Sequence, residues 1–304
     1  MRTKHILSAP LKETAPCMGA NTTFTDNRES PLMRKTLLAL SLVAASAPVL
    51  AADYSDDVHK NDYKWLQFNL MYSLDEKPAS SEATKDGHDY LEMEFGGRSG
   101  IFDLYGYVDI FNLTSSDDQD KSNSADKMFM KFAPRMSIDG LTGKDLSFGP
   151  VQELYVATLF NWGGNNGGVN NSFYGLGSDI NVPWLGKVGL NVYALYDINN
   201  KDWNGYQIST NWFKPFLNFS NGSFLSYQGY IDYQFGMKDE YASASNGGVM
   251  FNGIYWHSER FAVGYGLKLY KDVYGLKDGS ATGFDGGTWE STGVSHYFDV
   301  TYKF

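Results

Sequence analysis

The chain has 304 residues and a formal net charge of −10 at pH 7, because 35 acidic residues outnumber 25 basic ones. This excess of negative charge argues against a nucleic-acid partner. The only cysteine is Cys17, which excludes a disulfide within the chain. Aromatic residues make up 16% of the chain and glycine contributes 32 residues, a composition typical of many strands joined by tight turns.

The amino-terminal region has the pattern of a secretory leader. A short basic segment and an apolar run precede small residues that end at Ala51. This order predicts a signal peptide cleaved after Ala51, and the apolar run is too short to span a bilayer as a helix. We expect residues 1–32 to be an upstream extension outside the native product, residues 33–51 to be the signal peptide and residues 52–304 to fold.

Twelve later segments have the composition of strands. Apolar and polar residues alternate in several of them, which indicates strands with two chemically different faces. Pro134 lies inside one such segment, where its missing N–H predicts a bulge or a kink. The expected strands cover residues 64–72, 89–95, 102–112, 128–138, 149–160, 173–180, 188–196, 205–215, 224–235, 249–256, 261–270 and 293–304.

The last segment ends in Phe304 and alternates over its whole length. Val300 and Tyr302 share an apolar face, whereas Asp299 and Lys303 share a polar one. Such a strand resembles the closing strand of a bacterial outer-membrane β-barrel, whose terminal phenylalanine is read by the insertion machinery. A soluble sandwich that ends in an amphipathic strand remains the alternative at this point.

The connections between the expected strands alternate in length. Long polar connections are expected at residues 73–88, 113–127, 161–172, 236–248 and 271–292, with a moderate one at 197–204. Mostly shorter ones are expected at residues 96–101, 139–148, 181–187, 216–223 and 257–260. Short periplasmic turns and long extracellular loops are typical of outer-membrane barrels, and a sandwich has no reason to keep that order. The sequence therefore predicts an all-β fold, a closed antiparallel transmembrane β-barrel of twelve strands with a narrow lumen.

If the apolar faces meet lipid, the polar faces line the lumen. Carboxylates beside a guanidinium, with tyrosines near them, could hydrogen-bond a sugar and flank a planar ring. The same groups could instead form an internal ion-pair network that rigidifies the wall. We expect Glu94, Asp103 and Arg135 to lie at a similar depth. The candidate substrate-binding residues are Tyr90, Glu92, Glu94, Asp103, Tyr105, Tyr107, Asp109, Lys131 and Arg135.

The histidines give little support to catalysis or metal binding. His59, His88, His257 and His296 are scattered and lack metal-ligand spacing. We expect none of them to project into the lumen beside a serine and a carboxylate, as a hydrolase would need. The sequence therefore predicts no enzyme activity, no metal and no cofactor.

Six segments, taken in order, carry a family resemblance. They read DYLEMEF at 89–95, FDLYGYVD at 102–109, PRMSIDGLTGKDLSFGP at 134–150, YGLGSDI at 174–180, NVYA at 191–194 and WNGY at 203–206. They resemble the Tsx family of nucleoside-specific channel-forming outer-membrane proteins, and within it the vibrio-type OmpK branch. The resemblance implies a monomeric twelve-stranded barrel that passes nucleosides along aromatic and ionisable wall residues, with outer loops that bacteriophages use as receptors.

We therefore expect an outer-membrane channel for passive diffusion of small hydrophilic solutes, with nucleosides as the first hypothesis. The expected partners are outer-membrane lipid, the solute, bacteriophage on the exposed loops and the barrel insertion machinery through Phe304. A structural or receptor barrel with a closed lumen is the main alternative, and a barrel enzyme is a weaker one.

Overall fold

The structure is a computed structural model and describes residues 52–83, 87–114, 127–163 and 168–304. The expected extension and signal peptide, residues 1–51, lie outside these ranges. Among the described residues, no helix has the length and apolar character needed to cross a bilayer. Most of the regular structure is β-strand, as the alternating sequence pattern predicts.

The strands of the described part follow the expected segments closely. They are β1 Tyr63–Leu74, β2 Ala79–Ser80, β3 His88–Ser99, β4 Phe102–Phe111, β5 Met128–Phe132, β6 Arg135–Ser137, β7 Val151–Trp162, β8 Asn170–Val182, β9 Gly186–Asp197, β10 Asp202–Asn218, β11 Phe224–Phe235, β12 Asn246–His257, β13 Phe261–Lys271, β14 Trp289–Glu290 and β15 Gly293–Lys303. Two short helical segments lie in the connections, α2 at Ile138–Thr142 and the 3-10 turn η1 at Val273–Gly275.

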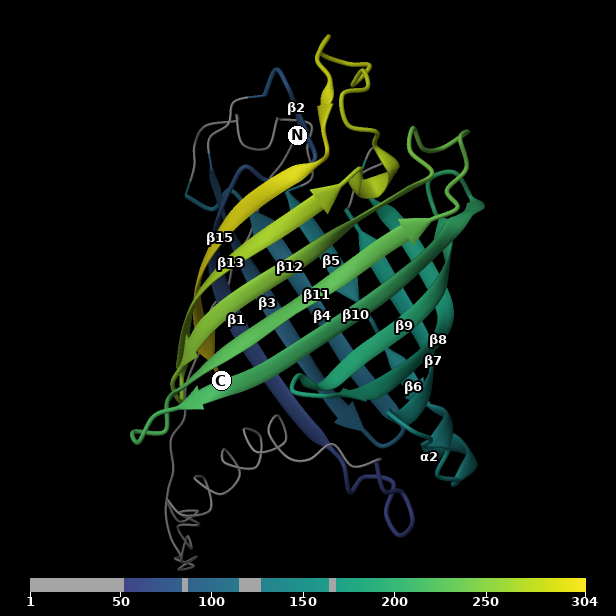
Figure 1. Cartoon of the computed structure of the whole chain (residues 1–304), viewed down its shortest axis with the longest axis vertical. Coiled ribbons are helices and arrows are strands. Elements are labelled where there is room, and N and C mark those ends of the chain that lie inside the picture. The colour runs from purple at the N-terminus through teal and green to yellow at the C-terminus, as the bar shows by residue number, and fades with distance from the viewer. Residues whose placement is uncertain (1–51, 84–86, 115–126, 164–167) are drawn as a thin grey trace, which may run out of the picture. The chain divides into compact units, whose positions relative to one another are not determined.

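The main sheet closes on itself (Figure 1). Its antiparallel order is β3, β1, β15, β13, β12, β11, β10, β9, β8, β7, β5 and β4, and β4 pairs back onto β3. β6 lies between β4 and β7, as β5 does, so these two short strands occupy one of twelve positions around the ring. The Phe304 N–H donates to the Leu66 carbonyl at 3.1 Å and extends the pairing of the last strand with the first. The predicted twelve-stranded antiparallel barrel is confirmed.

The break between β5 and β6 occurs at Pro134, as its missing N–H predicts. The backbone at the break is still hydrogen-bonded to both neighbouring strands. The Ala133 N–H donates to the Tyr105 carbonyl at 2.8 Å, and the Pro134 carbonyl accepts from the Thr158 N–H at 3.1 Å and from its hydroxyl at 2.9 Å. The strand is therefore interrupted while the wall stays closed.

The two faces of the barrel differ in chemistry. Leu70, Leu176 and Val300 are between 51% and 65% exposed, as expected for apolar side chains that face lipid. Their sequence neighbours point the other way: Asn69 is 3% exposed and Thr301 is 2% exposed. The strand period of two therefore places apolar groups outside and polar groups inside.

One of the expected plain turns contains a helix. The Ser137 hydroxyl accepts the Gly140 N–H at 2.9 Å and caps the start of α2, and Gly143 ends the helix with a φ of 66°. Within this helix the Asp139 carboxylate accepts the backbone N–H of Leu154 at 3.1 Å, which ties the turn to β7.

Two long connections also pair with each other. β2 lies in the connection after β1, and β14 lies in the connection before β15. They form a two-stranded ladder in which Trp289 lies opposite Ser80 and Glu290 lies opposite Ala79. Lys77 adds an ion pair to Glu290 at 2.6 Å. The pattern of single strands could not predict this contact, because the paired residues are about two hundred positions apart.

Candidate functional site: the barrel lumen

All nine candidate residues lie on the inward register of their strands. On β3 and β4 the register sets Glu94 opposite Tyr107 and Glu92 opposite Asp109. The structure does not gather the nine into one site. It separates them into a carboxylate group on β3 and β4, an arginine group near the α2 end of the barrel, and Lys131 on β5.

The carboxylate group is held by neutral hydrogen-bond donors. Gln67 donates to Glu94 at 2.6 Å, because β1 pairs with β3 in a register that sets the two residues opposite each other. Asn69 donates to Glu92 at 2.6 Å and to Glu94 at 3.2 Å. The Tyr105 hydroxyl donates to the other oxygen of Glu94 at 2.8 Å. The donors in these bonds are all neutral. The carboxylates can therefore still accept hydrogen bonds from a solute.

Aromatic rings extend along the same wall. The ring centroids of Trp65 and Tyr105 are 6.3 Å apart, and Tyr105 and Tyr107 are also 6.3 Å apart. Tyr107 lies 6.1 Å from Phe129, and Tyr90 lies 5.7 Å from Phe111. Rings at these separations make offset or edge contacts and present flat apolar surface beside the carboxylates.

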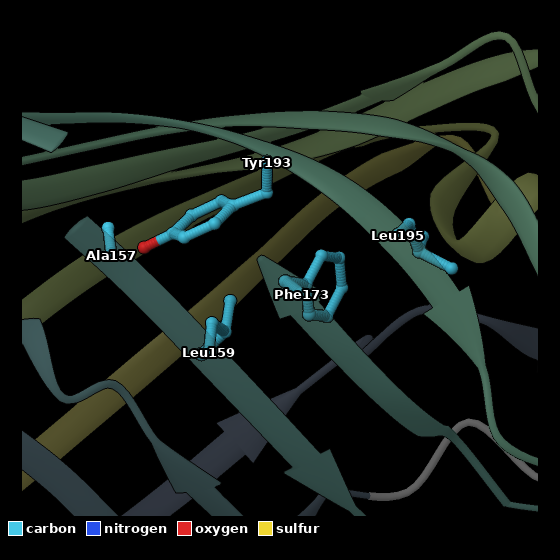
Figure 2. Packing of buried hydrophobic residues seen from close by; sticks show 5 residues of the cluster. All are labelled: Ala157, Leu159, Phe173, Tyr193 and Leu195. Carbon is cyan, nitrogen blue, oxygen red and sulfur yellow. The ribbon is translucent and has the colours of Figure 1, made fainter. Parts of the chain in front are cut away.

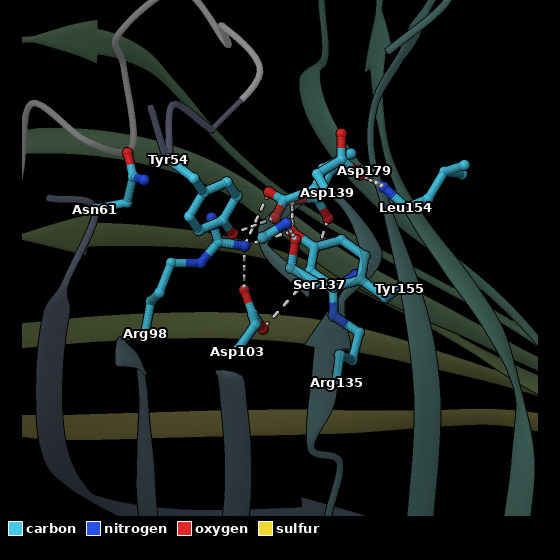
Figure 3. A network of polar contacts seen from close by, with 12 residues as sticks. Tyr54, Asn61, Arg98, Asp103, Arg135, Ser137, Asp139, Leu154, Tyr155 and Asp179 are labelled. Carbon is cyan, nitrogen blue, oxygen red and sulfur yellow. Dashed lines mark hydrogen bonds and ion pairs between the residues drawn. The ribbon is translucent and has the colours of Figure 1, made fainter. Parts of the chain in front are cut away.

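Asp103 and Arg135 belong to a separate ion-pair network (Figure 3). The Arg135 guanidinium lies 3.3 Å from Asp103 and 3.0 Å from Asp179, and it stacks over the Tyr155 ring at 4.0 Å. Arg98 donates to Glu153 at 2.9 Å and to the Tyr155 hydroxyl at 2.5 Å. Paired charges of this kind tolerate burial because each desolvated ion has a partner.

The expected depth of Glu94 is wrong, whereas that of Arg135 is confirmed. Arg98, and not Glu94, lies opposite Asp103 on the neighbouring strand, while Arg135 also pairs with Asp103 in register. The reason is the length of the hairpin turn. β3 continues to Ser99, so only two residues connect it to β4, and the register shifts relative to a six-residue connection.

The network also reaches the segment before β1. The Tyr54 hydroxyl donates to Glu153 at 2.6 Å. Burial, and then this hydrogen bond to a carboxylate, raise the pKa of Tyr54 to about 12. The amino-terminal residues of the described chain are therefore attached to the end of the barrel that carries α2.

Lys131 contacts a strand on the other side of the ring. Its ammonium lies 3.0 Å from the Asp232 carboxylate on β11, which is not a neighbour of β5. It also lies 5.5 Å from the centroid of the Tyr230 ring. Lys131 therefore makes a contact across the lumen, which the separate strand patterns could not predict.

Comparison with known proteins assigns this chain to a family. The family described as "Nucleoside-specific channel-forming protein, Tsx" matches residues 60–304. The chain belongs to this Tsx family. Outer membrane protein OmpK of Vibrio parahaemolyticus is 71% identical over 279 residues, which cover 90% of this chain and 100% of that protein.

Two further comparisons concern a more distant relative and a solved structure. The nucleoside-specific channel-forming protein Tsx of Salmonella typhimurium is 30% identical over 296 residues, covering 90% of this chain and all of that protein. Among solved structures, a KdgM porin matches 78% of this chain and 99% of its own with a TM-score of 0.44 and 12% identity. This Tsx-family chain is an outer-membrane channel.

Two histidines of this Tsx-family channel lie in strands and not in the connections expected at residues 73–88 and 257–260. His88 begins β3 and lies 2.5 Å from Glu76, and His257 ends β12 with its ring 2.8 Å from the Ser226 hydroxyl. The other ring nitrogen of His257 lies 3.5 Å from the Lys303 ammonium. A serine-histidine pair in a hydrolase needs a carboxylate at that second nitrogen. Within the described residues there is also no group of three potential metal ligands.

Several lumen residues were missed by the sequence reasoning. Arg98 falls inside the expected turn at 96–101, where strand alternation assigns no inward face. Glu153, Asp179 and Asp232 lie on the polar faces of expected strands. The alternation of polar and apolar residues along these strands indicated that these side chains face inward. The partner of each charge depends on the register and the closure of the barrel, which no single strand encodes.

Proposed function

We propose that this Tsx-family channel passes nucleosides by passive diffusion along the carboxylate group of β3 and β4. The observation that carries the proposal is the close arrangement of Glu92 and Glu94 with the aromatic row on β1, β4 and β5. Carboxylates accept hydrogen bonds from ribose hydroxyls, and tyrosine rings stack on planar bases. The Salmonella typhimurium relative is named as a nucleoside-specific channel-forming protein, and this name supports the same solute class for this chain.

We assign different roles to eight of the nine candidate residues. Tyr90, Glu92, Glu94, Tyr105, Tyr107 and Asp109 are proposed to contact the solute. Asp103 and Arg135 already have ionic partners and are proposed to hold the wall. A channel of this kind needs weak and reversible contacts, because a tight site would retain the solute.

Current through single barrels in a planar bilayer tests the solute. Adenosine and thymidine should reduce the current through the unmodified barrel, and Glu94→Gln should weaken this block because the carboxylate acceptor is lost. Leu104→Ala is the matched control, since Leu104 lies on the lipid-facing register of the strand that carries Tyr105. A current that is indifferent to both nucleosides but sensitive to other solutes would contradict the nucleoside assignment.

The paired outer connections favour a second role. β2, β14 and the Lys77–Glu290 ion pair hold two long connections together at one end of the barrel. Loops held on a rigid scaffold are suited to recognition, and we propose that bacteriophages adsorb to them. Cells that carry the channel should adsorb phage better than cells that lack it, and Trp289→Ala should reduce adsorption while the current is kept. Equal adsorption by both kinds of cell would refute this role.

We also propose that the barrel is a monomer without enzymatic activity and that the insertion machinery reads Phe304. Phe304 is 68% exposed. Its ring centroid lies 5.6 Å from that of Phe68 on β1, the strand with which β15 closes the barrel. Phe304→Ala should lower the amount of folded barrel in the outer membrane. An unchanged amount would show that the residue is dispensable.

A further inference from the structure

The ion pair between Lys131 and Asp232 crosses the lumen. On one side of the ring β5 and β11 are separated by β7, β8, β9 and β10, and on the other by β4, β3, β1, β15, β13 and β12. The Nζ–Oδ2 distance is 3.0 Å, and the two side chains are 17% and 18% exposed. We call this pair the lumen bridge. Adjacent strands are already joined by their backbones, so a side-chain contact between distant strands divides the space inside.

The carboxylate end of the lumen bridge is fixed by further hydrogen bonds. The other oxygen of Asp232 accepts from the Ser209 hydroxyl at 2.6 Å and from Gln207 at 3.3 Å. Gln207 in turn donates to Ser209 at 2.8 Å and accepts from Gln234 at 3.0 Å. Gln207 is 2% exposed, so this network is packed against the wall. A carboxylate with these donors is held in one orientation toward Lys131.

The side of the bridge that holds β7 to β10 is filled. We call it the packed sector. An apolar cluster occupies it, formed by residues of β7, β8 and β9, and Figure 2 shows these side chains facing one another. Phe173 and Ala157 are fully buried. The inward side chains that are less than one-tenth exposed on these four strands include Tyr155, Ala157, Leu159, Asn161, Phe173, Asp179, Asn191, Tyr193, Leu195, Gln207 and Ser209. The high burial of these side chains disfavours the passage of a solute here.

The other side keeps partly exposed side chains beside a second buried cluster of Met71, Tyr90 and Tyr297, and we call it the open sector. Glu92, Glu94, Tyr107 and Lys268 remain partly exposed on its wall. Its charges are mostly negative. Asp109 and Asp299 are 8% and 5% exposed, and one oxygen of each carboxylate lacks a hydrogen-bond partner within the described residues. Buried polar atoms of this kind require a partner, and a passing solute or hydrated cation can supply one.

We propose that the lumen bridge confines permeation to the open sector, and that the carboxylates of this sector select neutral and cationic solutes over anions. A passage lined by one sign of charge with low-dielectric walls concentrates ions of the opposite sign. Four carboxylates, those of Glu92, Glu94, Asp109 and Asp299, outnumber the two ammonium groups on the inward faces of these strands, those of Lys268 and Lys303. The inference rests on the chain being a channel and does not depend on nucleosides being its solute.

Cysteine substitutions locate the path. Cys17 is the only cysteine, so Cys17→Ser gives a cysteine-free background. Tyr107→Cys probes the open sector, and Ala157→Cys probes the packed sector with little change in volume. A cationic methanethiosulfonate reagent should react with the first variant and reduce its current, and should leave the second unmodified. Reaction and current block at Ala157→Cys would overturn the proposal, provided that the heat-dependent electrophoretic mobility of the barrel shows it folded.

Reagent charge and removal of the bridge test the remaining parts. At Tyr107→Cys the cationic reagent should react at least about tenfold faster than an anionic reagent of similar size, and equal rates would refute the charge selection. The double variant Lys131→Ala/Asp232→Ala should raise the single-channel conductance, whereas an unchanged conductance would refute the role of the bridge. These readouts stay valid if nucleosides prove not to permeate, so failure of the solute assignment and failure of this inference are distinguishable.

Discussion

Replacement of Arg135 by methionine separates a structural role from a solute-binding role. The substitution keeps much of the side-chain volume and removes contacts to Asp103 at 3.3 Å, to Asp179 at 3.0 Å and to the Tyr155 ring at 4.0 Å. Breaking a buried ion pair by removing one partner costs about 3–5 kcal/mol. Asp179 keeps Lys187 at 2.5 Å and Asp103 keeps Arg98 at 3.7 Å. We therefore expect the lower end, a loss of about 3 kcal/mol in the free energy of unfolding.

Denaturant unfolding of the barrel in lipid vesicles, followed by tryptophan fluorescence, measures this loss. Lys187→Met is the matched control, because Lys187 also pairs with Asp179 but its side chain is 45% exposed. Exposed pairs contribute about 1 kcal/mol or less, so the control should be much milder. Arg135→Lys should recover only part of the loss, since an ammonium cannot contact both carboxylates and stack on the ring as a guanidinium does.

Two results would refute this reasoning. A loss below about 1 kcal/mol for Arg135→Met would show that the network contributes little to stability. An unchanged stability together with a changed nucleoside block would show that Arg135 contacts the solute.

Three further predictions concern packing, pH and processing. Gly175→Ala should reduce the yield of folded barrel, because a Cβ there would lie 1.9 Å from the Val192 carbonyl oxygen. Gly177→Ala should be milder, because its Cβ would meet the movable Asn191 side chain. Refolding yields in vesicles compare the two variants. Burial and the bond to Glu153 raise the pKa of Tyr54 to about 12. The contribution of the Tyr54–Glu153 hydrogen bond to stability is therefore complete below about pH 10, where an unfolded tyrosine is still protonated, and is lost as the pH rises toward 12. Trypsin cleavage after Lys60 should increase over that range, and Tyr54→Phe should abolish the pH dependence of cleavage that this phenol causes. Mass spectrometry of the exported protein should give Ala52 as its first residue, and any product that retains residues 33–51 would contradict the predicted cleavage.

The strand pattern predicted most of the fold because its physical cause is local. A period of two assigns each residue to one of two faces, and lipid outside a barrel forces the apolar face outward. Phe102, Val300 and Tyr302 could therefore be assigned to lipid, and Asp299 and Lys303 to the lumen, without knowledge of the neighbouring strands. The break at Pro134 was equally local, because it follows from one missing N–H.

The partners of the inward residues could not be predicted in the same way. The position of Arg98 opposite Asp103 depends on a two-residue turn, and a different turn length shifts every pair in the hairpin. The contact between Lys131 and Asp232 depends on closure of the whole ring, since it joins strands that never share a backbone hydrogen bond.

The sequence by itself determined that this chain forms an amphipathic barrel. The alternation of each strand and the length of each turn are properties of single segments, and the absence of a disulfide follows from the composition. Which part of the lumen is filled and which part stays open was decided only by the tertiary structure. Alternation states that a side chain points inward but not what it meets there, and the lumen bridge and the packed sector arise from residues that closure of the sheet brings together.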